Sequence, residues 1–372
     1  MPSGPAHDTK RSYSLMVKLG LALGSIVLTV LLLEAAFRVV GIRGQYLAQR
    51  VDRVLPGPGG ETATVELGFV PGSTIVSRYD TDPRGTFGPD ATVEHKFNSA
   101  GWRDQERQLE KPEGTFRILG LGDSYLFGQG IAQEDICLSK LEGMLQDQED
   151  DRRIESINTG ISGFNTGNQR DLLIRRGLEY DPDLVIVFFV LNDVEANANQ
   201  ENTRVEFFRE YTALYQEPDT LSNYSHLWSW GRQKILQRTR GNSYIRECVE
   251  SFSENSEKWS RCRQALSDIR QTCAERKIGL LVAIFPFFVD LDGEYPFQSI
   301  HDTVQSYCQQ AGIDVLDLRD AYREHPGPDL WVHPTDQHPN EEAHQIAATA
   351  IADHLQAGSL LKQDDNQPAR RD

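Results

Sequence analysis

The sequence predicts an α/β fold in three layers, with helices on both faces of a doubly wound parallel sheet. From residue 116 onward, short apolar runs alternate with stretches in which apolar residues recur at helical spacing. The run Leu184–Val190, LVIVFFV, is apolar at every position, as expected of a central parallel strand that is covered on both faces. Strands and helices that alternate in this way form a sheet between two helical layers.

The alternation gives the order of the elements. Residues 194–258 do not follow it, and we interpret them as an insertion near the ligand-binding edge; their aromatic residues could cover a pocket or simply pack on the surface. Strands are expected at residues 117–121, 154–158, 184–190, 280–285 and 314–316, and helices at residues 134–145, 166–177, 262–275, 299–310 and 340–356.

An apolar segment at residues 15–37 is long enough to cross about 30 Å of hydrocarbon as a helix. Basic residues lie before it, which predicts that residues 1–14 stay in the cytoplasm and that the rest of the chain is exported to the periplasm or the cell exterior. A cleaved signal peptide is the rival interpretation. The sequence EAAFR at residues 34–38 is a poor cleavage site and favours an uncleaved membrane anchor.

The remaining chain divides by composition. Residues 42–98 are rich in Gly, Pro and Thr and are interpreted as a stalk or accessory segment that packs loosely, with short strands at residues 74–77 and 93–97. Residues 99–356 form the main domain, and residues 1–14 and 357–372 are expected to be disordered. The formal net charge of −17 argues against a nucleic-acid partner, because phosphate binding needs clustered Lys and Arg.

The five cysteines are interpreted in the light of export. Cys137 lies on the apolar face of the helix expected from residue 134 and is predicted to be a buried thiol. The other four could form two disulfides in an oxidising compartment; the preferred pairs are Cys248 with Cys262 and Cys273 with Cys308, and other pairings stay open. None of the spacings suits a zinc site, and no metal or organic cofactor is expected.

A serine stands where open α/β sheets bind their ligands. The sequence FRILGLGDSYLFGQG places Ser124 on the turn after a buried strand. A hydroxyl at the carboxyl end of a parallel strand faces the binding crevice, and the helix that follows points its amides at developing negative charge. An ordinary Gly-Asp-Ser turn is the alternative, so the interpretation depends on a base and an oxyanion hole further along the chain.

Three later segments supply those groups. Gly163 follows the second strand and allows a backbone amide to approach a substrate oxygen, and Asn192 follows the central strand, where its amide can donate to an oxyanion. His338 is a candidate general base, with Asp336 close enough to orient its imidazole. Ordinary turns and a helix start are the structural alternatives, and His333 and His344 are competing histidines.

In this order the segments resemble the motifs of the SGNH hydrolases, the GDSL-type esterases and lipases, in the form found in membrane-anchored bacterial relatives. The resemblance covers about residues 97–356, and NSAGWRD at residues 98–104 looks like the lead-in of the anchored relatives. It is carried by GDSY at 122–125, NTGISG at 158–163, LND at 191–193 and DQHPN at 336–340.

The resemblance implies a flavodoxin-like sandwich with a five-stranded parallel sheet. It also implies Ser124 as nucleophile, His338 as its base and Asp336 as orienter, with an oxyanion hole formed by the amides of Ser124 and Gly163 and the side chain of Asn192. Two positions depart from the family pattern. Val190 stands where a glycine is usual, and the Asp-x-His spacing of the last block also occurs in exported polysaccharide O-acetyltransferases.

These observations favour a membrane-anchored, outward-facing serine esterase that hydrolyses O-acyl esters, O-acetyl groups among them, of a small molecule or carbohydrate through an acyl-enzyme. An O-acyltransferase that acts on an envelope or exported polysaccharide is the second hypothesis. The third is an inactive domain that binds an acylated glycan or a protein partner.

Overall fold

The structure is a computed structural model that describes residues 9–44, 50–60, 67–149, 152–194 and 219–361. The chain divides into two compact units, which we describe separately. The first comprises residues 1–47 and 212–241, and the second comprises residues 48–211 and 242–372.

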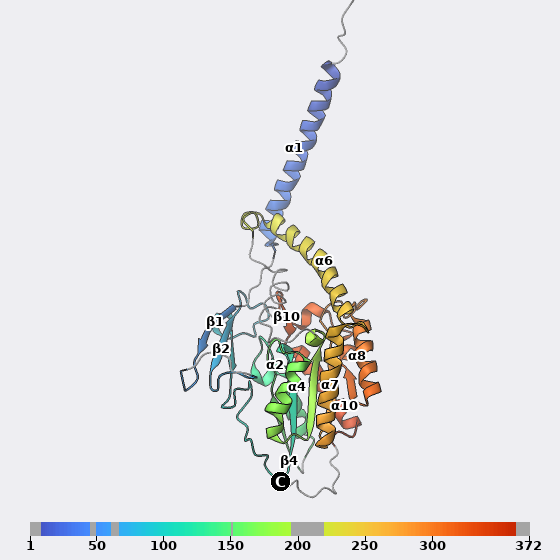
Figure 1. The fold of residues 1–372 in the computed structure, drawn as a ribbon. Helices are drawn as coiled ribbons and strands as arrows, with labels where there is room; N and C mark the ends of the chain where they lie inside the picture. The colour runs from blue at the N-terminus through green and yellow to red at the C-terminus, as the bar shows by residue number, and fades with distance from the viewer. Residues whose placement is uncertain (1–8, 45–49, 61–66, 150–151, 195–218, 362–372) are drawn as a thin grey trace, which may run out of the picture. The chain divides into compact units, whose positions relative to one another are not determined.

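The second unit is built on a five-stranded sheet in which every pair of neighbouring strands is parallel (Figure 1). The strand order is β5-β4-β6-β7-β8. The predicted three-layer α/β fold and its five strands are confirmed, with boundaries that shift by one or two residues. The strands are β4 (Thr115–Gly122), β5 (Arg153–Asn158), β6 (Leu184–Val190), β7 (Gly279–Phe285) and β8 (Asp314–Asp317).

Helices cover both faces of this sheet. On one face α3 (Cys137–Gln146) packs against α10 (Glu341–Ala357), and on the other α4 (Thr166–Arg175) packs against α7 (Glu257–Glu275). Helix α8 (Gln298–Ala311) joins α7, since the Tyr307 hydroxyl donates to the Arg263 carbonyl at 2.7 Å. Right-handed crossovers place successive helices in this way when the chain moves along the sheet in one direction and then the other.

The strand order explains where a site must lie. The chain passes from β4 outward to β5, then returns across β4 to β6, so the connections after β4 and after β6 diverge. Ligands of open α/β sheets bind in the crevice at the carboxyl ends of such strands. Ser124 directly follows β4 and Asn192 directly follows β6, which brings both predicted site segments to this point.

Two helix starts differ from the sequence prediction. The helix expected from residue 134 is a 3-10 turn at Gln133–Asp135 followed by α3 from Cys137, because Ile136 between them is extended (φ −64°, ψ 137°). Helix α7 starts at Glu257, ahead of the predicted residue 262, because Ser256 caps it by accepting from the Trp259 amide at 3.3 Å.

The accessory segment packs more closely than the sequence led us to expect. It forms an antiparallel sheet of β1 (Arg50–Leu55), β2 (Thr74–Arg78) and β3 (Thr92–Lys96), of which β1 was not predicted. The rings of Phe69 and Phe97 stack with centroids 4.0 Å apart and are buried in the main core. The described residues of this segment from Arg50 onward therefore belong to the second unit, and Phe69 and Phe97 lie in its core.

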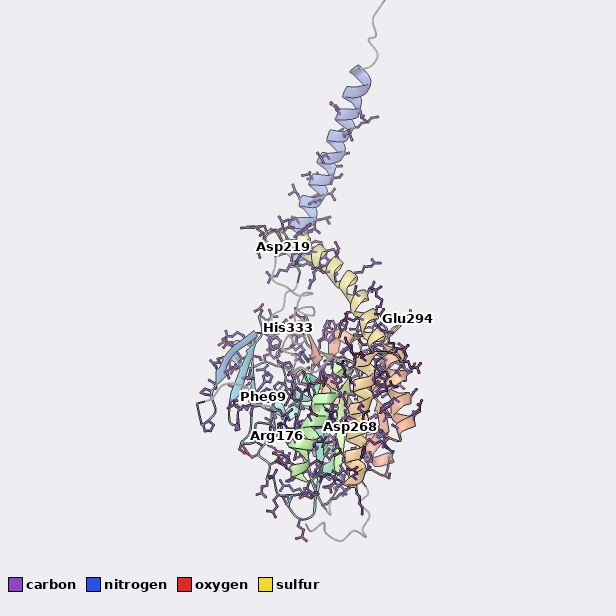
Figure 2. All side chains as sticks on the ribbon, in the orientation of Figure 1. Phe69, Arg176, Asp219, Asp268, Glu294 and His333 are labelled. Atoms are coloured by element: carbon purple, nitrogen blue, oxygen red, sulfur yellow. The ribbon has the colours of Figure 1, made fainter. Side chains whose placement is uncertain are left out.

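Arg176 reinforces the same attachment from the side of the main domain (Figure 2). Its guanidinium lies 3.9 Å from the centroid of the Trp102 ring and donates to the carbonyls of Leu67 and Ala100, each at 2.7 Å. A delocalised cation with several donors can stack on an aromatic ring and bind carbonyls at once.

The disulfide prediction is wrong. Cys248, Cys262, Cys273 and Cys308 are buried thiols, and neither expected bridge forms. These side chains belong to the hydrophobic core, where they act as small apolar groups. Cys137 is a buried thiol as predicted, and burial raises its pKa, so it stays protonated at neutral pH.

The first unit contains the apolar helix α1 (Thr9–Val40). Its stretch Leu15–Val40 contains an 18-residue window with a mean hydropathy of 2.3. The stretch is long and apolar enough to cross a membrane, a property that a signal sequence shares. Residues 9–14 are helical, although the sequence predicted disorder there. Helix α6 (His226–Ser251) lies in the predicted insertion and runs from this unit into the second.

The two predicted disordered ends lie mostly outside the described residues. Residues 1–8 and 362–372 are among those that the structure does not describe, as are residues 195–218 of the insertion. Leu360 and Leu361, at the start of the carboxyl-terminal tail, pack against the main core.

Candidate active site

Ser124 opens a single helical turn directly after β4. The turn, α2 (Ser124–Phe127), is capped by Asp123, whose Oδ1 accepts from the Tyr125 amide at 2.8 Å. It ends at Gly128, which has a left-handed backbone (φ 77°) that favours glycine. The strand and the two caps together hold the Ser124 hydroxyl at the carboxyl edge of the sheet.

His338 reaches Ser124 from a short hairpin near the other end of the chain. The hairpin pairs β9 (Trp331–His333) with β10 (Asp336–Pro339), and α10 begins immediately after it. The His338 Nε2 atom lies 2.9 Å from Ser124 Oγ, and His338 Nδ1 lies 2.5 Å from Asp336 Oδ1. The structure therefore joins the predicted nucleophile, base and orienter in one chain of hydrogen bonds.

The electrostatic surroundings of His338 suit its use as a proton acceptor. Burial alone lowers the pKa of His338, but the charge and hydrogen bond of Asp336 outweigh it, so the net pKa lies above the usual 6.5. Burial raises the pKa of Asp336, and the His338 charge with several hydrogen bonds reverses this, so its net pKa is lowered. An ionised Asp336 can thus stabilise the imidazolium that forms when His338 takes a proton.

Asn192 is linked to Ser124 by Asp123, which both side chains contact. The Asn192 Nδ2 atom donates to Asp123 Oδ2 at 3.1 Å, and the Ser124 hydroxyl lies 3.5 Å from the same oxygen. Burial raises the pKa of Asp123 above its usual value. The sequence motif did not identify Asp123 as a residue that orders the site, although Asp123 stands next to Ser124 in it.

Gly163 lies on the loop that follows β5, with a left-handed backbone (φ 77°). Within this loop the Ile161 amide donates to the Gly122 carbonyl at 3.2 Å, which ties the loop to the end of β4 just before Ser124. A residue with a Cβ would be strained at the Gly163 conformation. The loop is thus held at the edge of the sheet where the resemblance requires it.

A tyrosine that no sequence motif identified also contacts this group of residues. Tyr79 follows β2 in the accessory segment, and its hydroxyl donates to Asp336 Oδ2 at 2.7 Å. Burial and the Asp336 charge raise the pKa of Tyr79 well above its usual value, so the hydroxyl keeps the proton that it donates. Asp336 is therefore held on both oxygens, by His338 on one side and by Tyr79 on the other.

Neighbours of Tyr79 bind the rest of the β9–β10 hairpin. Thr81 Oγ1 lies 2.9 Å from His333 Nε2, and Arg84 Nε donates to the Val332 carbonyl at 2.9 Å. Arg84 also forms an ion pair with Glu341 at the start of α10. The competing histidines have other contacts: His333 bonds Thr81, and His344 Nδ1 accepts from the Cys137 amide at 3.0 Å.

The lead-in at residues 98–104 braces the loops around Ser124. Trp102 Nε1 donates to the Tyr180 hydroxyl at 3.0 Å. The fully buried Arg103 donates to the carbonyls of the turn after α2, among them Phe127 at 2.7 Å, and burial lowers its pKa to about 9. Asp104 Oδ2 accepts from the Asn158 amide at the end of β5 at 3.0 Å, and burial raises its pKa to about 7.

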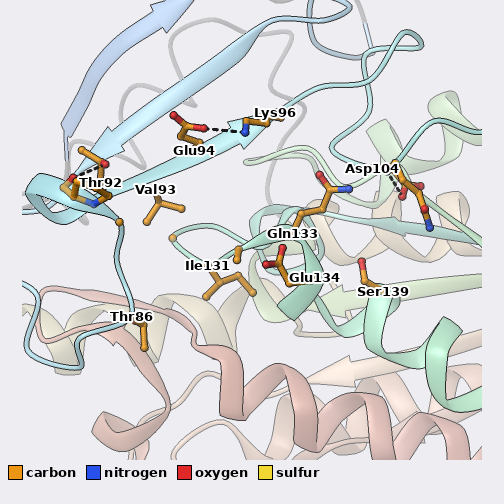
Figure 3. A pocket seen from close by; sticks show the side chains of 15 residues that line it. Thr86, Thr92, Val93, Glu94, Lys96, Asp104, Ile131, Gln133, Glu134 and Ser139 are labelled. Carbon is orange, nitrogen blue, oxygen red and sulfur yellow. Dashed lines mark hydrogen bonds and ion pairs between the residues drawn. The ribbon is translucent and has the colours of Figure 1, made fainter.

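A pocket of about 790 Å³ lies between β3 and the turn before α3 (Figure 3). Its lining includes Glu94, Gln133, Glu134 and Ser139, but neither Ser124 nor His338. It is a separate feature from the hydrogen-bonded chain described above. Among the residues that the structure describes, no group of three or more His, Cys, Asp or Glu side chains is placed to hold a metal ion.

An SGNH-type ester hydrolase is expected to have a parallel sheet with the strand order found here. It is also expected to join a serine, a histidine and an aspartate at the carboxyl edge of that sheet. A model of the GDSL-like lipase/acylhydrolase family matches residues 121–346. The match covers more than half of the chain and includes all five predicted site residues. The chain belongs to this family and is an ester hydrolase by that membership.

Three solved structures with a similar fold match this chain over nearly the whole of their own length. TesA has 14% identity and a TM-score of 0.41, over 66% of this chain and 99% of TesA. The esterase EstA from Pseudoalteromonas sp. has 16% identity and a TM-score of 0.37, over 65% and 97%. The acetyl xylan esterase AlAXEase has 14% identity and a TM-score of 0.40, over 64% and 100%. No curated protein matches the chain.

Proposed function

We propose that this protein is a membrane-anchored, outward-facing serine esterase that hydrolyses O-acyl esters through a covalent acyl-enzyme. The observation that carries the proposal is the hydrogen-bonded chain from Ser124 Oγ through His338 to Asp336. A nucleophile within reach of a base that a third group orients is the signature of covalent acyl transfer.

In the first half-reaction, Ser124 Oγ attacks the ester carbonyl carbon while His338 Nε2 takes the hydroxyl proton. The tetrahedral intermediate collapses, His338 returns the proton to the leaving alkoxide, and an acyl-Ser124 ester remains. In the second half-reaction, His338 takes a proton from water while the water oxygen attacks the acyl carbon. The tetrahedral intermediate collapses, His338 returns the proton to Ser124 Oγ, and the acid leaves the regenerated enzyme.

The oxyanion hole is assigned to the amides of Ser124 and Gly163 and to the Asn192 side chain. An asparagine amide carries two N–H groups. One of those on Asn192 is committed to Asp123 Oδ2, which fixes the side chain and leaves the second for an oxyanion. A donor of this kind typically contributes about 2.7–4 kcal/mol to transition-state stabilisation.

The apolar helix supplies the proposed anchor. With α1 crossing the membrane and its basic flank in the cytoplasm, the catalytic unit lies outside the membrane, where O-acylated envelope carbohydrates are the substrates within reach. A protease added outside intact cells is then expected to digest the catalytic unit. Protection of that unit would contradict the outward orientation.

The catalytic proposal is tested with the detergent-solubilised full chain and an activated acetyl ester, with and without an oligosaccharide acceptor. We expect release of free acetate at a rate that the acceptor does not change. Transfer of acetyl to the acceptor in place of release would favour the acyltransferase. Absence of both reactions in the folded protein would leave the inactive binding domain.

The pH dependence follows from the raised pKa of His338. The base works only when neutral, so activity is present above its pKa and is lost as the pH falls through it. We expect kcat/KM to rise with pH along a one-proton limb whose midpoint lies above the usual histidine value of 6.5. A stopped assay between acidic and mildly alkaline pH measures the limb, and a midpoint below 6.5 would contradict the assigned pairing of His338 with Asp336.

Tyr79→Phe is expected to lower kcat about tenfold with KM unchanged, because Asp336 loses the hydrogen bond that fixes its orientation toward His338. Without the hydroxyl, the Asp336 charge is less dispersed and stabilises the imidazolium more strongly, so the acid limb moves to higher pH. Tyr322→Phe is a matched control, because it removes a buried hydroxyl that donates to the Ala343 carbonyl at 2.7 Å. If both variants show the same kcat and the same limb, Tyr79 acts only in folding.

A further inference from the structure

The last turns of α1 hold the beginning of α6 within the first unit. Glu34 Oε1 accepts from the His226 amide at 3.0 Å, and Glu34 Oε2 accepts from the Leu227 amide at 3.0 Å and from the Ser225 hydroxyl at 2.8 Å. The first amides of a helix lack partners within it, and a carboxylate is the favoured group to bind them. One helix thus caps another at the carboxyl end of the apolar span.

Two further contacts fix this arrangement. The ring of Phe37 on α1 meets the ring of Trp230 on α6 edge to face, with centroids 5.4 Å apart. The Gly44 amide donates to Ser229 Oγ at 3.0 Å, and a Cβ at Gly44 would lie only 2.6 Å from that oxygen. The start of α6 is therefore packed tightly at the end of α1, although the two are far apart in sequence.

The start of α6 and the turn just before it expose large apolar side chains. Tyr224 is 74% exposed and Ile235 is 65% exposed, and Trp228 is half exposed. Trp228 and Ile235 are seven residues apart, so they lie on the same face of the helix. Water-facing surfaces rarely gather aromatic and aliphatic side chains in this way. The whole set is Leu221, Tyr224, Trp228, Trp230 and Ile235.

The charge of the same stretch is opposite to that of the chain. Residues 221–240 contain four basic residues and no acidic one, in a chain with a net charge of −17. Arg232, Lys234 and Arg238 follow the two tryptophans. Asp219, just before the stretch, pairs with Arg232 at 3.2 Å and accepts from Trp228 Nε1 at 3.2 Å. Basic residues next to Trp and Tyr are typical of a segment at the headgroup level of a membrane.

We propose that residues 219–238, which we call the interfacial segment, lie in the headgroup layer of an anionic bilayer at the carboxyl end of the α1 span. The inference rests on the proposed anchoring of α1. If α1 crosses the bilayer, the level of Glu34 and Phe37 is the level at which the hydrocarbon ends, and the contacts above fix the interfacial segment there. Its aromatic rings then enter the headgroup boundary, and its basic side chains extend to anionic phosphates.

The experiment uses the full chain reconstituted in phosphatidylglycerol vesicles whose acyl chains carry bromine either close to the headgroup or close to the chain end. Bromine quenches tryptophan fluorescence on contact. We expect the wild type to be quenched most by bromine close to the headgroup. The Trp228→Phe/Trp230→Phe variant is expected to lose most of this quenching, because Trp102 and Trp259 are buried, at 1% and 3% exposure, in the second unit.

Two controls separate the interface from folding and from charge. Trp331→Phe removes a partly exposed tryptophan of the second unit and is expected to leave headgroup-level quenching unchanged. Lys234→Glu/Arg238→Glu is expected to reduce quenching in phosphatidylglycerol to the level in phosphatidylcholine. Quenching that survives the double tryptophan variant, or that is equal in the two lipids, would overturn the proposal.

The anchor is tested separately by resistance to extraction with alkaline carbonate. If the protein is extracted, the anchor proposal fails and the interfacial proposal falls with it, while ester hydrolysis stays testable. If the protein resists extraction but its tryptophans are not quenched, only the interfacial proposal fails. Cross-linking between chains through the interfacial segment, without quenching, would assign this surface to a second copy instead.

Discussion

Replacing Ser124 with alanine is expected to lower kcat for ester hydrolysis by about 10⁴-fold or more, with KM little changed. The substitution removes the only atom that can carry the acyl group in the proposed mechanism. It leaves the caps of α2 in place, because Asp123 bonds the Tyr125 amide rather than the Ser124 side chain. Initial rates with an activated acetyl ester measure the effect, after thermal unfolding has shown that the variant is folded.

The interpretation of that result depends on two companion variants. Ser139→Ala changes a serine that lines the separate pocket and is expected to have wild-type rates. His338→Ala combined with Ser124→Ala is expected to be no slower than Ser124→Ala alone, because residues that act as one unit are not additive. If the Ser124→Ala variant keeps a substantial fraction of the wild-type activity, the nucleophile is another group.

The second large effect is expected from Asp336→Asn, which should lower kcat by about 10⁴-fold. Tyr79 donates to one Asp336 oxygen and His338 faces the other. The His338 amide also donates to the oxygen that faces His338, at 3.2 Å, so an asparagine has donors on both sides and only one carbonyl oxygen. We expect the Tyr79 hydroxyl to take that oxygen, which leaves the NH₂ facing His338. That group can only donate to Nδ1, so the imidazole proton moves to Nε2, where it faces Ser124 Oγ and blocks proton acceptance.

This prediction has its own internal check. In the Tyr79→Phe/Asp336→Asn variant the donor that selects the wrong amide orientation is gone, so part of the lost activity is expected to return relative to Asp336→Asn. The pH profile of kcat/KM and the single-turnover rate report the change. A double variant slower than Asp336→Asn by the full Tyr79→Phe factor would contradict the proposed coupling between the two side chains.

The sheet was predictable because its strands are short, continuous apolar runs in the sequence. The run Leu184–Val190 is buried at every position, and a central parallel strand has no other composition that fits. The closeness of Ser124 and Asn192 was predictable from the strands, because the carboxyl ends of neighbouring parallel strands meet at one edge of the sheet. Helix starts were less predictable, since they depend on single residues such as the extended Ile136 and the capping Ser256.

Tyr79 was not predictable for a different reason. It contacts Asp336 across 257 positions of sequence, from a segment without helical or strand periodicity after β2, and a lone tyrosine there has no local signature. The cysteine pairing failed in a similar way. Even numbers of cysteines in an exported chain favour bridges, but the four lie where the core has apolar neighbours for them, and packing alone accounts for them.

The contacts of Tyr79, Thr81 and Arg84 with the β9–β10 hairpin also show how much of the sequence a fully active fragment needs. The family match covers residues 121–346 and contains Ser124, His338 and Asp336, but a fragment cut to that range would lose most of β4 and of α10. It would lack the donor on the second oxygen of Asp336 and the clamp on β9. A fragment that restores β4 and α10 but omits the accessory sheet is therefore expected to keep Ser124, His338 and Asp336 and to lose the contribution of Tyr79 to kcat, so full activity needs a residue from outside the family match.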